Sequence, residues 1–261
     1  MLFGYMPSFY ENDLIREIGF AKEHFDFVEI TPDIANIKYY AQNLKAIKLR
    51  LKNFQVLGHV YWGINLAEND REEIGKAIRS VALLRKFGAK KITVHPSYGS
   101  KNNMDLIRRN NLISFAEIAA YCSKKGVELL VENMPSRPFN RAADFQFLLK
   151  ELPDMGFTLD VGHARQISDL EFNRFLKLKD RIKHIHLHDN VGEFDHLPFR
   201  KIHSMEGIVR KMKKINNDFT TTLEMFYLYK NGRRIDMDAD YRRKMLLEQL
   251  GSIKRIAQAT K

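Results

Sequence analysis

Histidine and carboxylate side chains recur in this chain at the ends of short apolar segments. They stand in the sequences FVEIT, LGHVYW, TVHPSYG, LLVENMP, TLDVGHA, KHIHLHDN and TTLEMF. Zn²⁺, Mn²⁺, Co²⁺ and Fe²⁺ accept such side chains as ligands, and the single cysteine, Cys122, leaves no thiolate cluster to compete. Any one residue could instead cap a helix or make a structural hydrogen bond. Buried together, however, these groups repel or desolvate one another without a cation, so the set predicts a divalent-metal site.

Apolar segments with the length of strands alternate with longer segments of helical period. The predicted strands are Leu2–Met6, Phe27–Ile30, Val56–Val60, Lys91–His95, Val127–Asn133, Phe157–Val161, Ile182–Asp189 and Thr220–Phe226. The predicted helices are Asp13–His24, Ile34–Leu51, Asp70–Phe87, Met104–Lys125, Ala142–Leu152, Ser168–Lys179, Phe199–Ile215 and Asp238–Ala257. This alternation is typical of a parallel sheet, and eight such units favour closure. The sequence therefore predicts an α/β fold, a (β/α)8 TIM barrel that forms a single domain over residues 1–261.

Active-site groups of such a barrel project from the carboxyl ends of its strands. The candidates at those ends are Glu29, His59, His95, Glu132, Asp160, His163, His186, His188 and Glu224. Glu29 is expected either to cap the following helix or to support a ligand from behind. Side chains of a strand alternate between its two faces, so His184, His186 and His188 share the face toward the interior. We expect His186 and His188 to be ligand candidates, His184 to be deeper and structural, and Asp189 to orient a ligand or begin the loop.

Composition limits the class of protein. The chain carries 43 Lys and Arg against 32 Asp and Glu, a formal net charge of +11, which suits a phosphate on nucleic acid or on a small substrate. The basic residues are scattered, however, so a solvated surface and an anion-binding role stay equally open. No apolar run approaches the roughly 18 residues of a membrane span, and the N-terminus lacks a signal-peptide pattern. With one cysteine, these features predict a cytoplasmic protein without a membrane segment, while the oligomeric state stays open.

The motifs LVEN, LDVGHA, IHLHDN followed by HLP, and LEMF resemble, in this order, the xylose-isomerase-like barrel superfamily. The resemblance runs from about FVEIT to TTLEMF. This superfamily includes sugar-phosphate isomerases and epimerases, as well as the endonuclease IV group of abasic-site nucleases (AP endonuclease family 2).

The isomerase and epimerase branch holds one divalent metal with residues that match Glu132, Asp160, His186 and Glu224. The resemblance implies that Mn²⁺ or Zn²⁺, with Co²⁺ and Fe²⁺ as alternatives, binds two substrate oxygens and stabilises an enediolate. Glu132 and Glu224 would then remove and return a proton on opposite faces of the sugar carbon. His163 would contact a substrate hydroxyl or a second metal.

The nuclease branch uses three zinc ions, and the residues that match its further ligand positions are His59, His95, Asp160 and His163. The sequence departs from its pattern because Phe194 stands where an aspartate is expected two residues before His196. Asp195 adjoins His196 instead, and only a local bulge would bring both to one face. ENMPSR also replaces a glycine-containing ENTAG-like stretch, and Pro96-Ser97 replaces Pro-Gly. These departures favour the isomerase or epimerase, and an abasic-site nuclease or another phosphoesterase is the alternative.

Loop residues near the strand ends are the candidates for substrate binding. The expected phosphate contacts are Arg137, Arg165, Arg200 and Lys201, and the aromatic side chains expected to stack on a sugar ring or a base are Tyr61, Trp62 and Tyr98. The expected partner is a small sugar or sugar phosphate, with DNA under the alternative.

Overall fold

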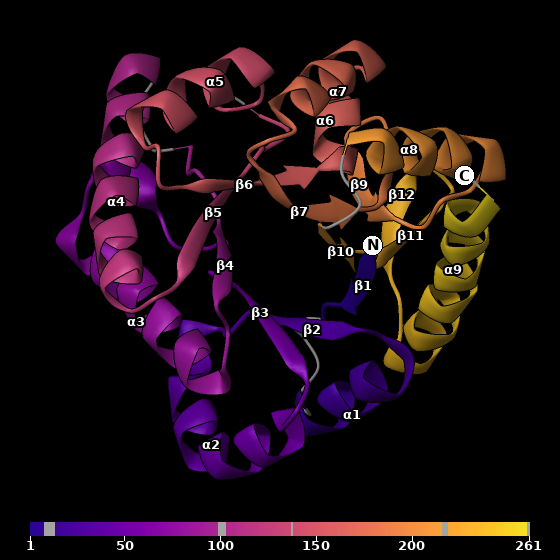
Figure 1. Cartoon of the computed structure of the whole chain (residues 1–261), viewed down its shortest axis with the longest axis horizontal. Coiled ribbons are helices and arrows are strands. Elements are labelled where there is room, and N and C mark those ends of the chain that lie inside the picture. The colour runs from indigo at the N-terminus through magenta and orange to yellow at the C-terminus, as the bar shows by residue number, and fades with distance from the viewer. Residues whose placement is uncertain (8–13, 99–102, 137, 216–218, 260–261) are drawn as a thin grey trace.

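The computed structural model describes residues 1–7, 14–98, 103–136, 138–215 and 219–259. Eight parallel strands close into a barrel in the order β1-β10-β7-β6-β5-β4-β3-β2 (Figure 1). Their bounds are β1 (Leu2–Tyr5), β2 (Phe27–Ile30), β3 (Gln55–His59), β4 (Lys91–Val94), β5 (Glu128–Glu132), β6 (Gly156–Asp160), β7 (Ile182–Leu187) and β10 (Thr220–Leu223). The predicted α/β class and TIM barrel are confirmed.

An outer ring of helices surrounds the barrel (Figure 1). These helices are α1 (Leu14–His24), α2 (Ile37–Leu51), α3 (Arg71–Phe87), α4 (Met104–Lys124), α5 (Ala142–Glu151), α6 (Val161–Ile167), α7 (Asp169–Phe175), α8 (Ile202–Ile215) and α9 (Ala239–Ala259). α3 shows how local residues set the ends of a helix. The Asp70 carboxylate accepts a hydrogen bond from the Glu72 amide at its start, and Gly88 ends the helix with a φ of 104°. Its buried stripe of Ile74, Val81 and Leu84 packs toward the strands.

The segment after β6 differs from the prediction of one helix over Ser168–Lys179. α6 begins directly at Val161, because the Asp160 side chain caps it and accepts a hydrogen bond from the His163 amide at 2.6 Å. The Ser168 hydroxyl then accepts a hydrogen bond from the Glu171 amide and begins α7. The motif LDVGHA is therefore a strand end joined to a helix without an intervening loop.

Two hairpins extend beyond the barrel and were not predicted. β8 (Asp189–Val191) pairs with β9 (Phe194–Leu197), and β11 (Tyr227–Lys230) pairs with β12 (Arg233–Asp236). The predicted strands through Asp189 and Phe226 thus end earlier, at Leu187 and Leu223. β9 lies against β11 beside the carboxyl ends of β7 and β10 (Figure 1).

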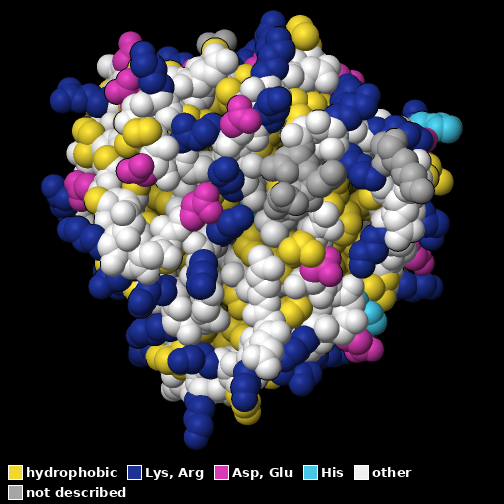
Figure 2. All heavy atoms as spheres, in the orientation of Figure 1, with side chains coloured by type: hydrophobic (Ala, Val, Ile, Leu, Met, Phe, Trp, Pro, Cys, Tyr) yellow, Lys and Arg dark blue, Asp and Glu magenta, His cyan; other side chains and the backbone are white. Residues whose placement is uncertain are grey.

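The excess of Lys and Arg over Asp and Glu is not gathered into one patch on the viewed face (Figure 2). Figure 2 shows Lys and Arg side chains spread around the whole outline of the viewed face. Within the described ranges, no helix combines the length and the apolar character that crossing a bilayer demands.

Candidate metal centre

Four buried residues converge at the carboxyl ends of β5, β6, β7 and β10. Glu132, Asp160, His186 and Glu224 each offer one ligand atom, and these atoms all lie within 4.8 Å of one another. We call this set the central group. The structure brings together the four residues that the superfamily resemblance implied as ligands of one metal.

His186 is oriented so that one ring nitrogen faces the carboxylates of this group. Its Nε2 lies 3.2 Å from both carboxylate oxygens of Glu29, so Nε2–H donates to Glu29. Its Nδ1 lies 3.0 Å from Glu132 Oε2 and 2.9 Å from Glu224 Oε2. Yet neither Nδ1 nor Glu224 Oε2 has a hydrogen-bond partner among the described residues, although both atoms are buried. Such atoms facing one another need a positive charge between them, which a proton on Nδ1 supplies without metal, and their donor chemistry also fits a divalent metal.

Glu29 was expected either to cap a helix or to support a ligand from behind. It contacts His186 on the side away from Glu132 and Glu224, so the supporting role fits. Its carboxylate accepts hydrogen bonds from His184 Nε2 at 2.9 Å and from the Thr222 hydroxyl at 2.5 Å, as well as from His186. Burial alone would raise the pKa of Glu29, but the charges of His184 and His186 lower it well below its ordinary value. His184 is deeper, and its Nδ1 bonds Thr220 Oγ1 at 2.7 Å, as a structural residue would.

A second set of ligand atoms shares Glu132 with the central group. His59 Nε2 lies 3.2 Å and His95 Nε2 3.1 Å from Glu132 Oε2. His59 Nδ1–H donates to the Val60 carbonyl at 2.8 Å, which leaves its Nε2 lone pair facing the carboxylate. Burial lowers the pKa of His95 and favours the neutral imidazole, the form that binds metals.

A third set of ligand atoms shares Asp160 with the central group and consists of Asp160, His163, His188 and His196, with Asp195 beside it. His196 has a φ of 55°, and this left-handed backbone lets both side chains face the pocket. Asp195 Oδ2 lies 3.8 Å from His163 Nε2, and its Oδ1 lies 3.0 Å from His196 Nδ1. The pairing of β8 with β9 also shifts its register, so a local irregularity of the kind that the sequence analysis left open brings this pair together. His163 Nδ1–H donates to the Asn133 carbonyl at 3.0 Å, so its Nε2 faces Asp195.

His188, expected as a ligand candidate, has both ring nitrogens engaged. Its Nδ1 lies 3.1 Å from the Asp189 carbonyl oxygen and 3.0 Å from the His196 amide nitrogen, and its Nε2 lies 3.0 Å from Asp160 Oδ2. His188 forms a group of possible metal ligands with Asp160, His163 and His196, so it stays a ligand candidate. Gly162 makes room for this ring, because a Cβ at that position would overlap it.

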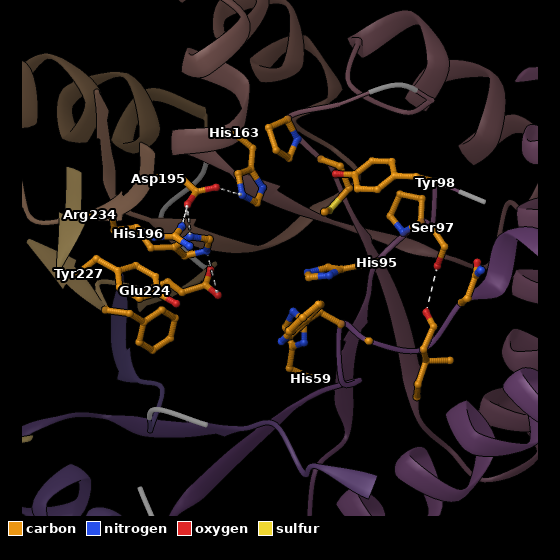
Figure 3. Close-up of a pocket in the computed structure, with 18 residues that line it drawn as sticks. His59, His95, Ser97, Tyr98, His163, Asp195, His196, Glu224, Tyr227 and Arg234 are labelled. Atoms are coloured by element: carbon orange, nitrogen blue, oxygen red, sulfur yellow. Dashed lines mark hydrogen bonds and ion pairs between the residues drawn. The ribbon is translucent and has the colours of Figure 1, made fainter. Parts of the chain in front are cut away.

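A cavity of about 630 Å³ opens above these groups (Figure 3). Its polar wall contains His59, His95, His163, Asp195, His196 and Glu224, and its remaining side chains include Trp62, Tyr98, Met134, Phe226, Tyr227 and Arg234. Glu132, Asp160 and His186 lie beneath it. Its size and its mixture of apolar walls with convergent polar groups are typical of a small-molecule site.

The residues expected to bind substrate have different outcomes. Trp62, which is 57% exposed, and Tyr98 line the cavity. Arg137 lies outside the described residues. Arg165 was expected in a loop at the mouth, but it lies on α6, where its guanidinium bonds Asp169 at 3.0 Å and Asp189 at 3.1 Å. These two carboxylates hold the Arg165 side chain outside the cavity lining.

The sequence reasoning did not identify Arg234, Tyr227 and Phe226 as part of the pocket. Two of them belong to the β11–β12 hairpin, and Phe226 directly precedes it. The signal was present, because Asn231-Gly232 between YLYK and RRID is typical of a two-residue hairpin turn. Asn231 and Gly232 have φ values of 52° and 75°, as that turn requires.

Comparison with known proteins places this geometry in a family. Residues 13–245 match the family model of the xylose isomerase-like TIM barrel. An uncharacterized protein of Methanocaldococcus jannaschii is 34% identical over 135 residues, which are 50% of this chain and 53% of the relative, so the match spans about half of that protein's length.

Solved structures share the fold at low identity. The structure of D-psicose 3-epimerase in the presence of D-fructose has a TM-score of 0.79 and 16% identity, covering 98% of this chain and 99% of that one. A protein of Thermus thermophilus soaked with ZnCl2 has a TM-score of 0.71 and 19% identity over 100% of both chains. Further sugar epimerases are among the similar structures. The chain belongs to the xylose isomerase-like TIM barrel family.

Proposed function

We propose that this protein is a divalent-metal-dependent isomerase or epimerase that acts on a sugar or sugar phosphate. The observation that carries the proposal is the approach of Glu132 and Glu224 to the same ring nitrogen, His186 Nδ1, at 3.0 and 2.9 Å. The two carboxylates come from β5 and from the residue after β10, with β6 and β7 between them. Such a pair can take a proton from one side of a substrate carbon and return it on the other.

The central group would hold the metal through Glu132, Asp160, His186 and Glu224. Its oxygen and nitrogen donors suit Mn²⁺ or Zn²⁺, and also Co²⁺ or Fe²⁺. The bound ion would stabilise negative charge that develops on substrate oxygens.

The chain's own groups would carry the proton and position the sugar. Burial raises the pKa of Glu224, but His186 and His196 lower it well below its ordinary value, so this cavity-lining carboxylate is ionised and can accept a proton. Glu132 lies deeper, where His59, His95 and His163 fix its orientation. His163 Nε2 is available to a substrate hydroxyl, and Trp62 offers an apolar face to the sugar ring.

A second candidate is a metal-dependent phosphoesterase of the abasic-site nuclease type. It is favoured by two further ligand sets, each of which shares one residue with the central group. One set is His59, His95 and Glu132, and the other is Asp160, His163, His188 and His196. These sets could hold two further ions in a row, as in a site that clamps a phosphodiester. DNA would then be the partner.

One experiment separates the two candidates. The purified protein is stripped of metal, reloaded with Mn²⁺ or Zn²⁺, and incubated in deuterated water with a panel of ketoses, aldoses and their phosphates. We expect solvent deuterium at the carbon next to the carbonyl, with about one metal per chain sufficient for turnover. Cleavage of duplex DNA at an abasic site, with three zinc ions per chain and no exchange in any sugar, would reject the first candidate and support the second.

A further inference from the structure

The β11–β12 hairpin brings a single cationic side chain to the cavity. Among the described residues that line it, Arg234 is the only lysine or arginine. Figure 3 shows Arg234 beside Tyr227 and Asp195, on the side of the pocket opposite Tyr98 and Ser97. The pocket thus has one positively charged side chain of its own, whereas the other described lysines and arginines lie outside its lining.

Two contacts hold the guanidinium of Arg234 in place. It lies 4.0 Å from the centroid of the Tyr227 ring, and its Nη1 donates to Asp195 Oδ1 at 2.8 Å. The Arg234 side chain is nevertheless 40% exposed. A guanidinium has five N–H donors, and the described contacts of Arg234 engage one of them. Its position is therefore fixed while donors remain for a ligand.

The ligand chemistry follows from the shape and charge of this group. A fixed, planar guanidinium binds a phosphate through two parallel hydrogen bonds, which a lysine cannot reproduce. Asp195 contacts Arg234 as well as His163 and His196. The guanidinium is therefore linked through a single side chain to two of the possible metal ligands. A small molecule with oxygens at the floor and an anionic group at the rim fits a cavity of about 630 Å³.

We propose that Arg234 binds the phosphate of a phosphorylated sugar and thereby selects this substrate class over unphosphorylated sugars. This inference rests on the proposed sugar isomerase or epimerase function. The hairpin then acts as a specificity element, since the floor carries the chemistry and the rim recognises the phosphate.

The competing role for Arg234 is to hold Asp195 without touching substrate. The test compares Arg234→Gln with Arg233→Gln, which removes the same charge from the adjacent position of β12, outside the cavity lining. The probes are D-fructose and D-fructose 6-phosphate, and D-ribulose and D-ribulose 5-phosphate. Binding to the metal-loaded protein is measured by calorimetry, and kcat/KM is measured for each sugar that turns over.

We expect the wild type to bind the phosphorylated member of a pair more tightly, and Arg234→Gln to lose roughly 10- to 100-fold in affinity for that member alone. Arg233→Gln should keep the preference. An equal loss for both members, or no preference in the wild type, would overturn the inference and leave Arg234 as a support for Asp195. Because binding is measured without turnover, a phosphate preference that Arg234→Gln removes supports the inference even if no sugar turns over, and in that case only the proposed function fails.

Discussion

The cavity floor and the cavity rim are built in different ways. The floor consists of fully buried side chains on β5, β6 and β7 and at the end of β10, where the register of a closed barrel fixes each position. The rim includes the β11–β12 hairpin with its left-handed turn and loop side chains such as Trp62 and Tyr98, which are partly exposed, and Arg234 is held there by its ion pair with Asp195. Under the proposed function, the buried floor would hold the metal and carry the proton, and the more exposed rim would select the substrate. Changes at the floor should therefore affect catalysis and metal binding, and changes at the rim should affect substrate choice.

The largest expected effect is at the floor, in Glu132→Gln. Glu132 lies within reach of His186, His59, His95 and His163, and it is one of the two proposed proton carriers. We expect kcat to fall by about 10³-fold or more, because a ligand and an acid–base group are lost together. Deuterium exchange and metal content measure the two losses. Glu128→Gln, at the other end of the same strand, is the matched control, and equal activity in both variants would refute the assignment of Glu132.

Glu29→Gln should produce the next largest effect, although Glu29 does not belong to the central group. A neutral amide would hold the His186 Nε2–H more weakly and could present the wrong hydrogen-bonding group to it. Removing such a supporting carboxylate typically lowers metal affinity about 10- to 100-fold. Competition with a chromogenic chelator measures this affinity.

Glu171→Gln is the control for Glu29→Gln, because Glu171 is also buried but bonds the Ala142 amide and Arg174, far from the centre in the fold. It should lower stability without weakening metal binding. If both variants bound the metal equally tightly, Glu29 would have no part in orienting His186.

Metal binding should change the number of protons bound by the residues of the floor. Burial lowers the pKa of His186, but the carboxylates of Glu132 and Glu224 outweigh it and raise this pKa well above 6.5. The raised pKa favours the protonated form of His186 in the metal-free protein, and because a metal binds the neutral imidazole, metal binding should release protons. Calorimetric titrations in two buffers of different ionisation enthalpy measure this release, and identical heats in both would contradict it.

The same shift gives the pH dependence its sign. Because the folded pKa of His186 is raised, the stability that its charged form contributes to the metal-free protein is complete below about pH 6.5 and is lost as the pH rises through the folded pKa. Metal affinity should run the opposite way and increase with pH over this interval.

The sequence predicted the floor better than the rim for a physical reason. Strand alternation and strand ends follow from local patterns, so KHIHLHDN was sufficient to separate the deep His184 from His186. The ring nitrogen that each histidine presents was not predictable, because it depends on partners such as Glu29, which lies 157 residues from His186. His188 shows the same limit, because its contacts are with Asp160 and with the backbone of the β8–β9 hairpin, which the sequence pattern did not reveal.

The smallest expected effect tests the rim through its turn. Gly232 has a φ of 75°, and an L-residue there costs about 1–2 kcal/mol, so Gly232→Ala should loosen the β11–β12 hairpin and the position of Arg234. We expect a few-fold rise in KM for a phosphorylated sugar with metal affinity unchanged. Gly207→Ala is the matched control, because Gly207 lies in α8 with open space at its Cβ. Hydrogen exchange of the hairpin amides and metal titration decide the matter: if Gly232→Ala weakened metal binding as much as substrate binding, floor and rim would be one cooperative unit, and the division between chemistry and selection would not hold.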